Sequence, residues 1–518
     1  MRPPIPLRML LFAALALAAA PARRLTAAAP IDERIFSGRP SGEPASFLVV
    51  LREEADLSGA ARIADRVERI RFVAGALREQ ANRSQAPLLA RLAAAGVPFR
   101  PYFVVNMIEV EAPRALAEEL ASRDDVSSVA ANPRIRIERE PVSRTDPSIL
   151  SASVELAIEP NLTRIGAPEV WERGFTGQGI VVGVADTGFV WDHPALKPHY
   201  RGFDGAVVSH DHHWHDAIHD AAAGNPCGAD APAPCDDDGH GTSTSGVSVG
   251  DDLAGNRIGV APGARLIGCR NMDRGVGTPA RYAECFEWFL EPTDVHGGNP
   301  RADLAPHVIN NSWGCPASEG CTDPNVLVAV VDHVVAAGIF VSVSAGNSGP
   351  SCATIDDAPT FYASSFTVAA TDLDDQIAGF SSRGPAAADG SGRLKPEIAA
   401  PGVNIRTSVS ADGYRTFSGT SAAAPHVTGA VALLWSSAPA LIGNVAATAS
   451  LLERTAAPLT STQDCGGFPG ASVPNAVFGW GRLDVAAAVA AAGAPTQPRA
   501  QPIPRPHRRP VGRVLPRS

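Results

Sequence analysis

The sequence predicts an α/β protein in which a three-layer α/β/α domain, built around a mostly parallel sheet, follows a smaller α+β domain. Segments VVGVAD (181–186) and FVSVSA (340–345) read as short apolar strands without polar alternation. Strands of that kind are buried on both faces, as in parallel sheets covered by helices. The length of 518 residues and the 45% apolar content are sufficient for a large core and for more than one domain.

The smaller domain is predicted over residues 45–140. Segments 46–51 and 103–112 are expected to be strands, with a helical stretch at 61–96 between them. Residues 115–137 then supply a second helix and a last strand. The order strand–helix–strand–helix–strand is typical of a small ferredoxin-like α+β domain.

The two ends of the chain have compositions of their own. Arg2 and Arg8 precede an apolar run at residues 9–20, which predicts a secretory signal peptide over residues 1–29, because the run is too short to span a membrane. We therefore expect an exported protein, extracellular or periplasmic, without a membrane span. Residues 493–518 are rich in Pro and Arg and contain no acidic residue, so this tail is expected to be disordered. The net charge of -10 argues against nucleic acid as a partner.

Ser421 is the first candidate for chemistry, because the small residues around it in FSGTSAAAPHVTGA (417–430) let another backbone approach its hydroxyl. The apolar run at 430–435 predicts a helix that begins at this serine. Unpaired N–H groups and the positive end of the dipole at a helix N-terminus stabilise a developing oxyanion. A serine that opens a helix is also a common N-cap, so its assignment as a nucleophile depends on partners elsewhere.

Two partners for Ser421 lie upstream. Asp186 ends an apolar strand before a Thr-Gly turn, and His240 lies between two glycines ahead of a run of small residues. Serine is a weak nucleophile until an imidazole takes its proton, and the imidazole needs a carboxylate to fix its tautomer. The order Asp, His, Ser therefore predicts a catalytic triad. Asn347, which follows the strand at 340–345, is a fourth candidate, as an amide donor to the oxyanion.

These motifs together resemble those of the subtilisin-like serine peptidases, or subtilases, over about residues 165–489. The segments that carry the resemblance are Asp186-Thr187-Gly188, His240-Gly241-Thr242, SAGNSG around Asn347, GTSAAAPHVTGA and GWGRLDVAAAV. Segments 165–171, 192–202, 287–294 and 308–314 resemble the bacillopeptidase F type more narrowly. The resemblance implies a monomeric serine endopeptidase domain over residues 161–492, which hydrolyses proteins through an acyl-enzyme and needs no catalytic cofactor. An esterase-type serine hydrolase is the main rival, and the order of the motifs counts against it.

The resemblance also suggests a role for residues 45–140. Subtilase propeptides look like this unit and act as a folding chaperone and an intramolecular inhibitor, with the C-terminal end in the active-site cleft. Residues 141–160 would then be a linker and the zone of self-cleavage. An ordinary accessory domain is the alternative interpretation.

Substrate-binding residues carry over from the same family. Ser312, Trp313 and Gly314 would form a strand edge that pairs with the substrate backbone. Asp357 belongs to the segment that closes the base of the primary specificity pocket in the family, where a carboxylate would attract Arg or Lys before the scissile bond. A loop carboxylate facing water is the alternative for Asp357.

Ser243 and Ala422 depart from the family pattern, because most members have His and Met at these positions. Neither position is required for proton transfer, so the triad prediction is unaffected. The missing Met removes a side chain that is prone to oxidation beside the nucleophile, which predicts resistance to peroxide.

All eight cysteines lie between residues 227 and 465. An even number in an exported protein predicts disulfides rather than free thiols. The favoured pairs, from their short loops, are Cys227–Cys235, Cys315–Cys321 and, with less support, Cys269–Cys285. Zinc binding is the competing interpretation, but no CxxC spacing supports it.

Three segments bear on metal ions. Residues 210–220 contain five histidines, of which His215 and His219 would share a helical face suited to Zn, Ni or Cu; a His-rich surface loop is the alternative. Residues 255–263 are too short for the main calcium loop of the family, and the carboxylate run 236–238 is more typical of a solvated surface. We therefore assign no metal ligand and leave structural calcium open.

Overall fold

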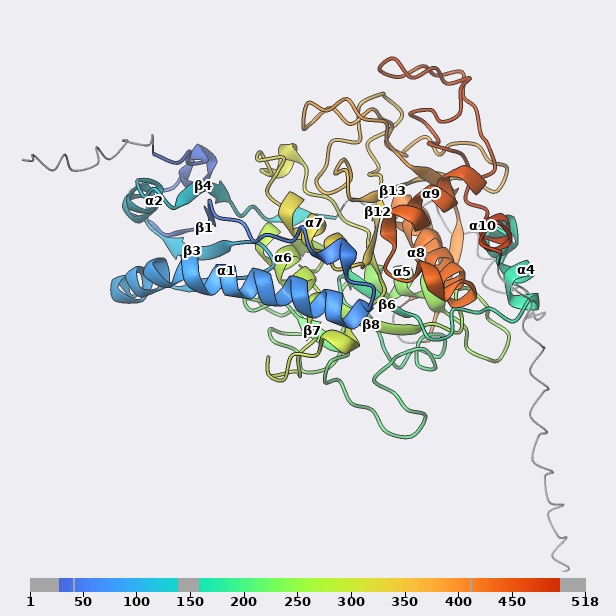
Figure 1. The fold of residues 1–518 in the computed structure, drawn as a ribbon, viewed down its shortest axis with the longest axis horizontal. Helices are drawn as coiled ribbons and strands as arrows, with labels where there is room; N and C mark the ends of the chain where they lie inside the picture. Colours follow the sequence, from blue (N-terminus) through green and yellow to red (C-terminus); the bar gives the residue numbers. More distant parts are fainter. Residues whose placement is uncertain (1–27, 41, 138–157, 410–411, 494–518) are drawn as a thin grey trace, which may run out of the picture.

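The computed structural model describes residues 28–40, 42–137, 158–409 and 412–493. An N-terminal unit that ends at residue 137 lies beside a larger unit that begins at residue 158 (Figure 1). Most of the predicted signal peptide (1–29), linker (141–160) and tail (493–518) lies outside the described residues. Within the described part of the chain, none of the helices combines the length and the apolar character needed to cross a membrane.

The N-terminal unit is a four-stranded antiparallel sheet with a helix in each crossover connection. Its elements in chain order are β1 (Ala45–Leu51), α1 (Arg66–Ala95), β2 (Phe99–Tyr102), β3 (Met107–Ala112), α2 (Arg114–Ala121) and β4 (Val126–Ala131). The strand order β2-β3-β1-β4 is ferredoxin-like, as predicted. The predicted strand at 103–112 is wrong at its start, because residues 103–106 are the turn of a hairpin between β2 and β3. Val104 in this turn is buried against the larger unit, which explains an apolar run outside any strand.

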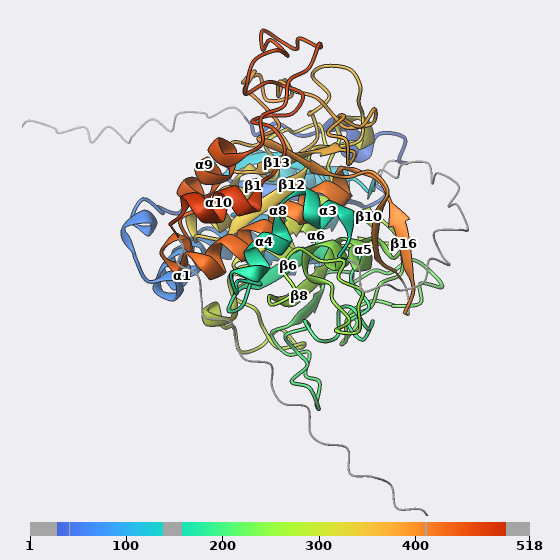
Figure 2. The same cartoon turned by 90° about the vertical axis from the view of Figure 1, so that its right-hand side faces the viewer.

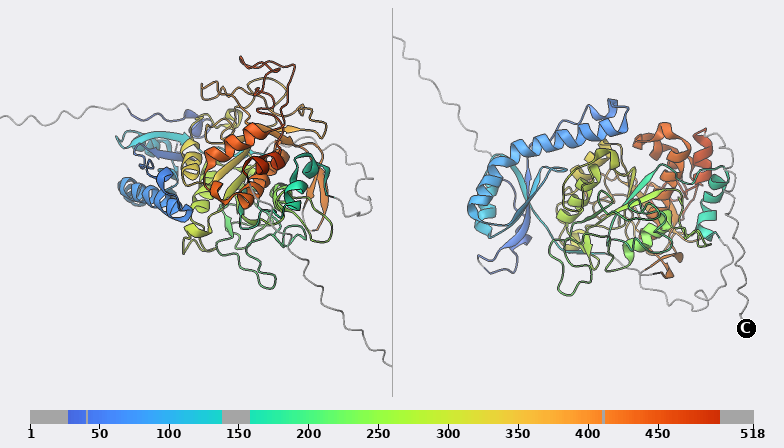
Figure 3. Two further views of the ribbon diagram at one scale, coloured as in Figure 1. Left: turned by 45° about the vertical axis from the view of Figure 1, so that its right-hand side comes forward. Right: turned by 90° about the horizontal axis from the view of Figure 1, so that it is seen from below.

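Helix α1 is 30 residues long and has a cap at each end. The Asp65 side chain accepts the Glu68 N–H, and Gly96 ends the helix with a φ of 66°, in the left-handed region that favours glycine. The first half of α1 continues past the sheet of its own unit and lies along the larger unit (Figure 3).

The larger unit contains a seven-stranded sheet in which every neighbouring pair is parallel. Its strands in spatial order are β14 (Ile398–Pro401), β13 (Phe366–Thr371), β12 (Phe340–Ser344), β11 (Val308–Asn311), β6 (Val181–Asp186), β8 (Arg265–Arg270) and β7 (Trp214–Asp216). After β6 the chain forms β7 at one edge, returns to β8 beside β6 and then crosses to β11 on the other side of β6, so the strand order reverses between β6 and β11. In open α/β sheets, ligands bind beyond the carboxyl ends of the strands at such a reversal.

Helices cover both faces of this sheet, which gives the predicted three layers (Figures 1 and 2). Alternate residues of one strand enter different cores: Val308 packs on the face of α8, and Ile309 packs on the face of α6 and α7. The face of α8 (Thr420–Ser437) also holds α3 (Pro160–Arg164), α4 (Ala167–Glu172), α5 (His240–Val249), α9 (Val445–Thr455) and α10 (Val485–Ala491). The opposite face holds α6 (Pro279–Leu290) and α7 (Val328–Ala336).

The N-terminal unit packs against α6 and α7. The Glu287 carboxylate of α6 accepts the backbone N–H groups of Phe103 and Val104 at 2.5 and 2.9 Å. His333 of α7 contacts the Val104 carbonyl at 2.6 Å through Nδ1. The β2–β3 turn is therefore held by polar contacts on both helices, around an apolar core that the two units share.

The eight cysteines form four disulfides, all within the larger unit. The three favoured pairs, Cys227–Cys235, Cys269–Cys285 and Cys315–Cys321, are confirmed. The fourth, Cys352–Cys465, joins residues 113 positions apart, a separation that no local spacing could indicate. Zinc binding by cysteines is thereby excluded.

Candidate active site

Asp186 and His240 come from two elements that meet at the carboxyl end of the sheet. Asp186 is the last residue of β6 and is fully buried, and His240 is the first residue of α5. His240 Nδ1 lies 2.8 Å from Asp186 Oδ1, and the Thr244 hydroxyl donates to the other carboxylate oxygen at 3.2 Å. A carboxylate at Nδ1 fixes the tautomer in which Nε2 is free to accept a proton.

Ser421 is the second residue of α8, as the apolar run after it predicted. Its N–H is therefore one of the first four in the helix, which have no partner inside the helix. The Ser421 hydroxyl donates to the Ser312 carbonyl at 3.3 Å. Because α5 and α8 pack against each other, the two helix starts bring the serine and the histidine to the same end of the sheet.

Asn347 follows β12 and lines the same cavity as Ser421. Its amide oxygen accepts both the Thr420 N–H and the Thr420 hydroxyl, each at 2.9 Å. This pair of contacts fixes the orientation of the amide, with its oxygen toward Thr420. A donor from Asn347 and one from the Ser421 backbone are the arrangement that a tetrahedral oxyanion needs.

The predicted substrate residues line this cavity too. Ser312, Trp313 and Gly314 follow directly after β11, and the Trp313 indole donates to the Ala185 carbonyl at 3.1 Å. Asp357 is 7% exposed and lies at the cavity wall. A Cβ atom at Gly314 would approach the Asp357 carboxylate to 3.0 Å, so the glycine makes room for this carboxylate.

Asp236 is a contributor that the sequence interpretation missed. Its carboxylate accepts the Thr187 hydroxyl at 2.9 Å, the Gly239 N–H at 2.8 Å and the Thr242 N–H at 2.9 Å. It therefore ties the turn after Asp186 to the first turn of the helix that begins with His240. Burial raises the pKa of Asp236 to about 6. The expected solvated carboxylate run is wrong here, because the run is folded into the site.

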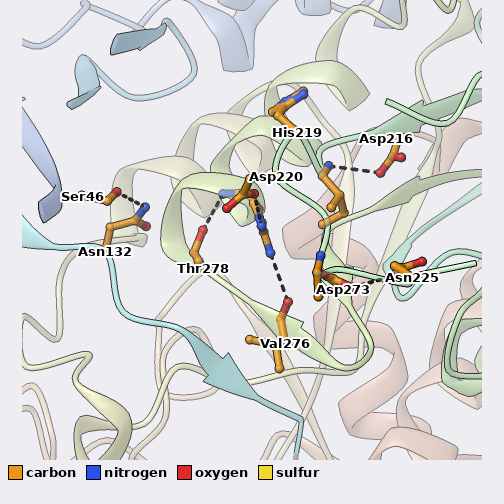
Figure 4. A network of polar contacts seen from close by, with 12 residues as sticks. Ser46, Asn132, Asp216, His219, Asp220, Asn225, Asp273, Val276 and Thr278 are labelled. Atoms are coloured by element: carbon orange, nitrogen blue, oxygen red, sulfur yellow. Dashed lines mark hydrogen bonds and ion pairs between the residues drawn. The ribbon is translucent and has the colours of Figure 1, made fainter. Parts of the chain in front are cut away.

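A buried network of ion pairs also holds the loop that precedes α5. Arg270, at the end of β8, donates to Asp216 at 3.0 Å and to Asp237 at 2.8 Å, and all three side chains are almost inaccessible to water. Figure 4 shows Asp216 of this network, with the contact between Asn225 and Asp273 beside it. Asp237 is therefore occupied by protein donors and does not face solvent.

The histidine-rich segment does not form the predicted helical face. His215 lies in β7, an edge strand parallel to β8, because the segment extends the sheet instead of coiling. His215 and His219 still converge, each within 2.9 Å of Glu284 Oε1. Among the described residues, no group of three or more His, Cys, Asp or Glu side chains is arranged to hold a metal ion.

Two features near His240 have structural roles. The Ser243 hydroxyl donates to the carbonyls of Gly239 and Ser408 at 2.9 and 3.1 Å, which stabilises the start of α5. Residues 246–250 read GVSVG, a pattern found at the nucleophile of esterase-type hydrolases. Here the stretch lies at the end of α5 and Ser248 is fully buried, so it is not a strand-to-helix elbow.

The three-layer fold, with the His240–Asp186 contact at the carboxyl end of its parallel sheet, is that of a subtilisin-like serine peptidase domain. The sequence profile of the subtilase family matches residues 177–481, more than half of the chain. The chain therefore belongs to the subtilase family, and the predicted family is confirmed.

Three curated relatives give the comparison detail. Bacillopeptidase F of Bacillus subtilis (strain 168) is 36% identical over 407 residues, which are 75% of this chain and 26% of the relative. Serine protease AprX of the same strain is 33% identical over 56% of this chain and 65% of the relative. Subtilisin E, also of that strain, is 30% identical over 54% of this chain and 61% of the relative. The chain thus spans less than two thirds of each of these relatives.

Proposed function

We propose that this protein is a secreted serine endopeptidase that hydrolyses peptide bonds in proteins, and that it is made as a zymogen. The observation that carries the proposal is the 2.8 Å contact between His240 Nδ1 and Asp186 Oδ1 at the strand end that adjoins Ser421. A binding module derived from a peptidase would have no need to keep all three groups and the Asn347 amide.

The chemistry follows from these groups. Ser421 Oγ attacks the substrate carbonyl while His240 Nε2 takes the hydroxyl proton, and Asp186 stabilises the imidazolium. The Ser421 N–H and the Asn347 NH₂ group donate to the oxyanion. His240 then returns the proton to the leaving amine, and water hydrolyses the acyl-enzyme by the same steps in reverse order. No catalytic cofactor takes part.

The N-terminal unit is proposed as the prodomain. β5 (Ile135–Arg136) pairs with β10 (Val276–Gly277), which in turn pairs with β9 (Met272–Asp273), and Arg136 and Ile137 line the cavity that contains Ser421. An extended segment added to a strand edge is how peptidases hold a substrate backbone. The self-cleavage zone proposed at 141–160 lies mostly outside the described residues.

Secretion, the monomeric state and preference for substrate belong to the same proposal. Export rests on the composition of residues 1–29, and each step of the proposed chemistry uses groups of a single chain. Asp357 is buried and lines the cavity that contains Ser421, which supports substrates with Arg or Lys before the scissile bond.

A comparison of the wild-type chain with Ser421→Ala tests this proposal. The wild type should lose its N-terminal unit and hydrolyse casein, and the alanine variant should do neither, apart from a residual rate. Thermal unfolding of the variant controls for folding. An alanine variant that matures by itself would overturn the assignment of the nucleophile.

A further inference from the structure

Helix α1 reaches the larger unit at a place distant from the cleft. Its first half lies against residues 302–306, which lead into the start of β11, whereas Ser312 follows the other end of that strand. The contact is therefore at the amino ends of the strands, opposite to the end at which Ser312 and Asp186 lie.

Two arginines of α1 make this contact. Arg66 donates through Nη2 to the Ala305 carbonyl at 3.0 Å and to the Pro306 carbonyl at 2.5 Å. Arg69 donates through Nε to the Ala336 carbonyl at 2.6 Å and through Nη1 to the Gly443 carbonyl at 3.0 Å. Each guanidinium thus contacts two backbone carbonyls, Arg66 through one nitrogen and Arg69 through two.

One of the carbonyl acceptors, that of Ala336, lies where a positive charge is stabilising. Ala336 is the last residue of α7, and the last carbonyls of a helix have no partner inside the helix and carry the negative end of its dipole. Residues 305–306, 336 and 443 belong to three segments that are far apart in the sequence. The two side chains therefore join three segments of the larger unit through charge-assisted hydrogen bonds.

We propose that Arg66 and Arg69 form a second anchor between the N-terminal unit and the larger unit, one that does not depend on the active-site cleft. The inference rests on the proposed function of the N-terminal unit as a prodomain. The anchor at the cleft, β5 on β10, lies next to the proposed cut, whereas the contacts of α1 are far from it in the sequence. The arginine anchor therefore adds to the contacts of the β2–β3 turn with α6 and α7 in retaining the cut prodomain on the enzyme, and during folding it holds the three segments together.

The test uses the full chain with Arg66→Ala and Arg69→Ala together, and Arg71→Ala as the matched control. Arg71 lies on the same helix, is 54% exposed and pairs with Glu68 within the helix, while toward the larger unit its charge helps to lower the pKa of Asp303. In the Ser421→Ala background, where nothing is cut, hydrogen exchange of amides 337–339 reports the end of α7, because these amides donate to its last carbonyls. Exchange there should be about tenfold faster in the double variant than in the control, as the loss of one charge-assisted hydrogen bond implies.

The active background tests retention of the prodomain. Size-exclusion chromatography at intervals after self-cleavage should show the cut prodomain leaving at least about tenfold faster in the double variant than in Arg71→Ala. The peptidase activity of fully matured enzyme should be the same in both, since the helix is then gone. Unchanged exchange or unchanged retention would overturn the second anchor.

A milder substitution keeps the test possible if the double variant does not fold. If the double variant gives no folded protein, Arg69→Lys is used, which keeps the charge but has one donor nitrogen in place of two. Amides 337–339 of this variant should still exchange faster than those of Arg71→Ala. Exchange equal to the control would then contradict the proposal. The exchange readout needs no catalysis, so the absence of casein hydrolysis in the wild type would refute the proposed function without deciding the anchor.

Discussion

At the scale of single residues, the glycines around the pocket matter as much as the charged groups. Gly314 and Gly346 leave space on two sides of the Asp357 carboxylate, since Cβ atoms there would stand 3.0 and 3.6 Å from Asp357 Oδ2. The carboxylate is thereby held at the wall of the cavity that contains Ser421.

Asp357 should set the cleavage preference. The wild type is expected to favour Arg or Lys before the scissile bond, and Asp357→Asn should lower kcat/KM for such substrates by about 10²-fold, because one partner of a desolvated charge pair is removed. Paired fluorogenic peptides, one basic and one apolar at that position, give the measurement. A wild-type preference for large apolar residues alone would contradict the prediction.

Ala422 should make the enzyme resistant to peroxide. The side chain beside Ser421 is fully buried and has no sulfur to oxidise. The wild type should therefore keep most of its activity during an incubation with hydrogen peroxide that inactivates Ala422→Met. Rapid loss of activity in the wild type would show that another group is the sensitive one.

The places of Asp186, His240 and Ser421 in the fold could be predicted because each has a strong local signal: a strand end, a glycine-flanked histidine and a small-residue helix start. Asp236 could not, because its role depends on three donors brought together from separate turns. The pairing of Glu284 with His215 and His219 could not be predicted either, because β7 is held in the sheet by pairing with β8, which is distant in the sequence.

At the scale of elements, the loop before α5 positions the catalytic histidine. Asp236 fixes the first turn of α5 relative to the end of β6, and the Cys227–Cys235 disulfide closes the loop just ahead of it. The site therefore depends on the placement of one helix start against one strand end.

Asp236→Asn should lower kcat by about 10²-fold with little change in KM, because an amide cannot accept all the donors and a small displacement of His240 is costly for proton transfer. Steady-state kinetics on a peptide substrate provide the measurement, with the exposed Asp192→Asn as a control. Thermal unfolding of both variants separates loss of fold from loss of position. An unchanged kcat in Asp236→Asn would remove the positioning role.

Most elements could be predicted from apolar runs, and the errors have a physical cause. Residues 103–106 are apolar because they pack on another unit, and the histidine segment forms an edge strand because β8 offers a free edge. A local run of apolar residues predicts that a segment is buried, but it does not indicate which part of the protein buries it.

At the scale of the whole molecule, the interface between the two units carries an ionisable group. Burial raises the pKa of Glu287 to about 7, with Glu284 acting in the same direction, while the two backbone N–H groups and Arg78 act against it. Once the N-terminal unit leaves, this carboxyl returns to water and to its ordinary range.

Docking of the prodomain should therefore weaken as pH rises. A carboxyl whose pKa is raised in the docked state favours docking when protonated, so this contribution is complete below the ordinary range of Glu and is lost as pH rises toward 7. Release of the cut prodomain, followed by size-exclusion chromatography, should be faster at pH 8 than at pH 5, by up to about 10²-fold. Glu287→Gln should flatten that dependence, and a dependence that persists in this variant would point to another group.

The distribution of the disulfides between the two units has a consequence for their resistance to proteolysis. All four disulfides lie in the larger unit, and the N-terminal unit contains no cysteine. In a medium that contains active protease, a chain without cross-links opens and is digested, whereas a cross-linked one resists. Under the proposed function, activation then runs in one direction only: the inhibitor is consumed by the enzyme it helped to fold, and it cannot return.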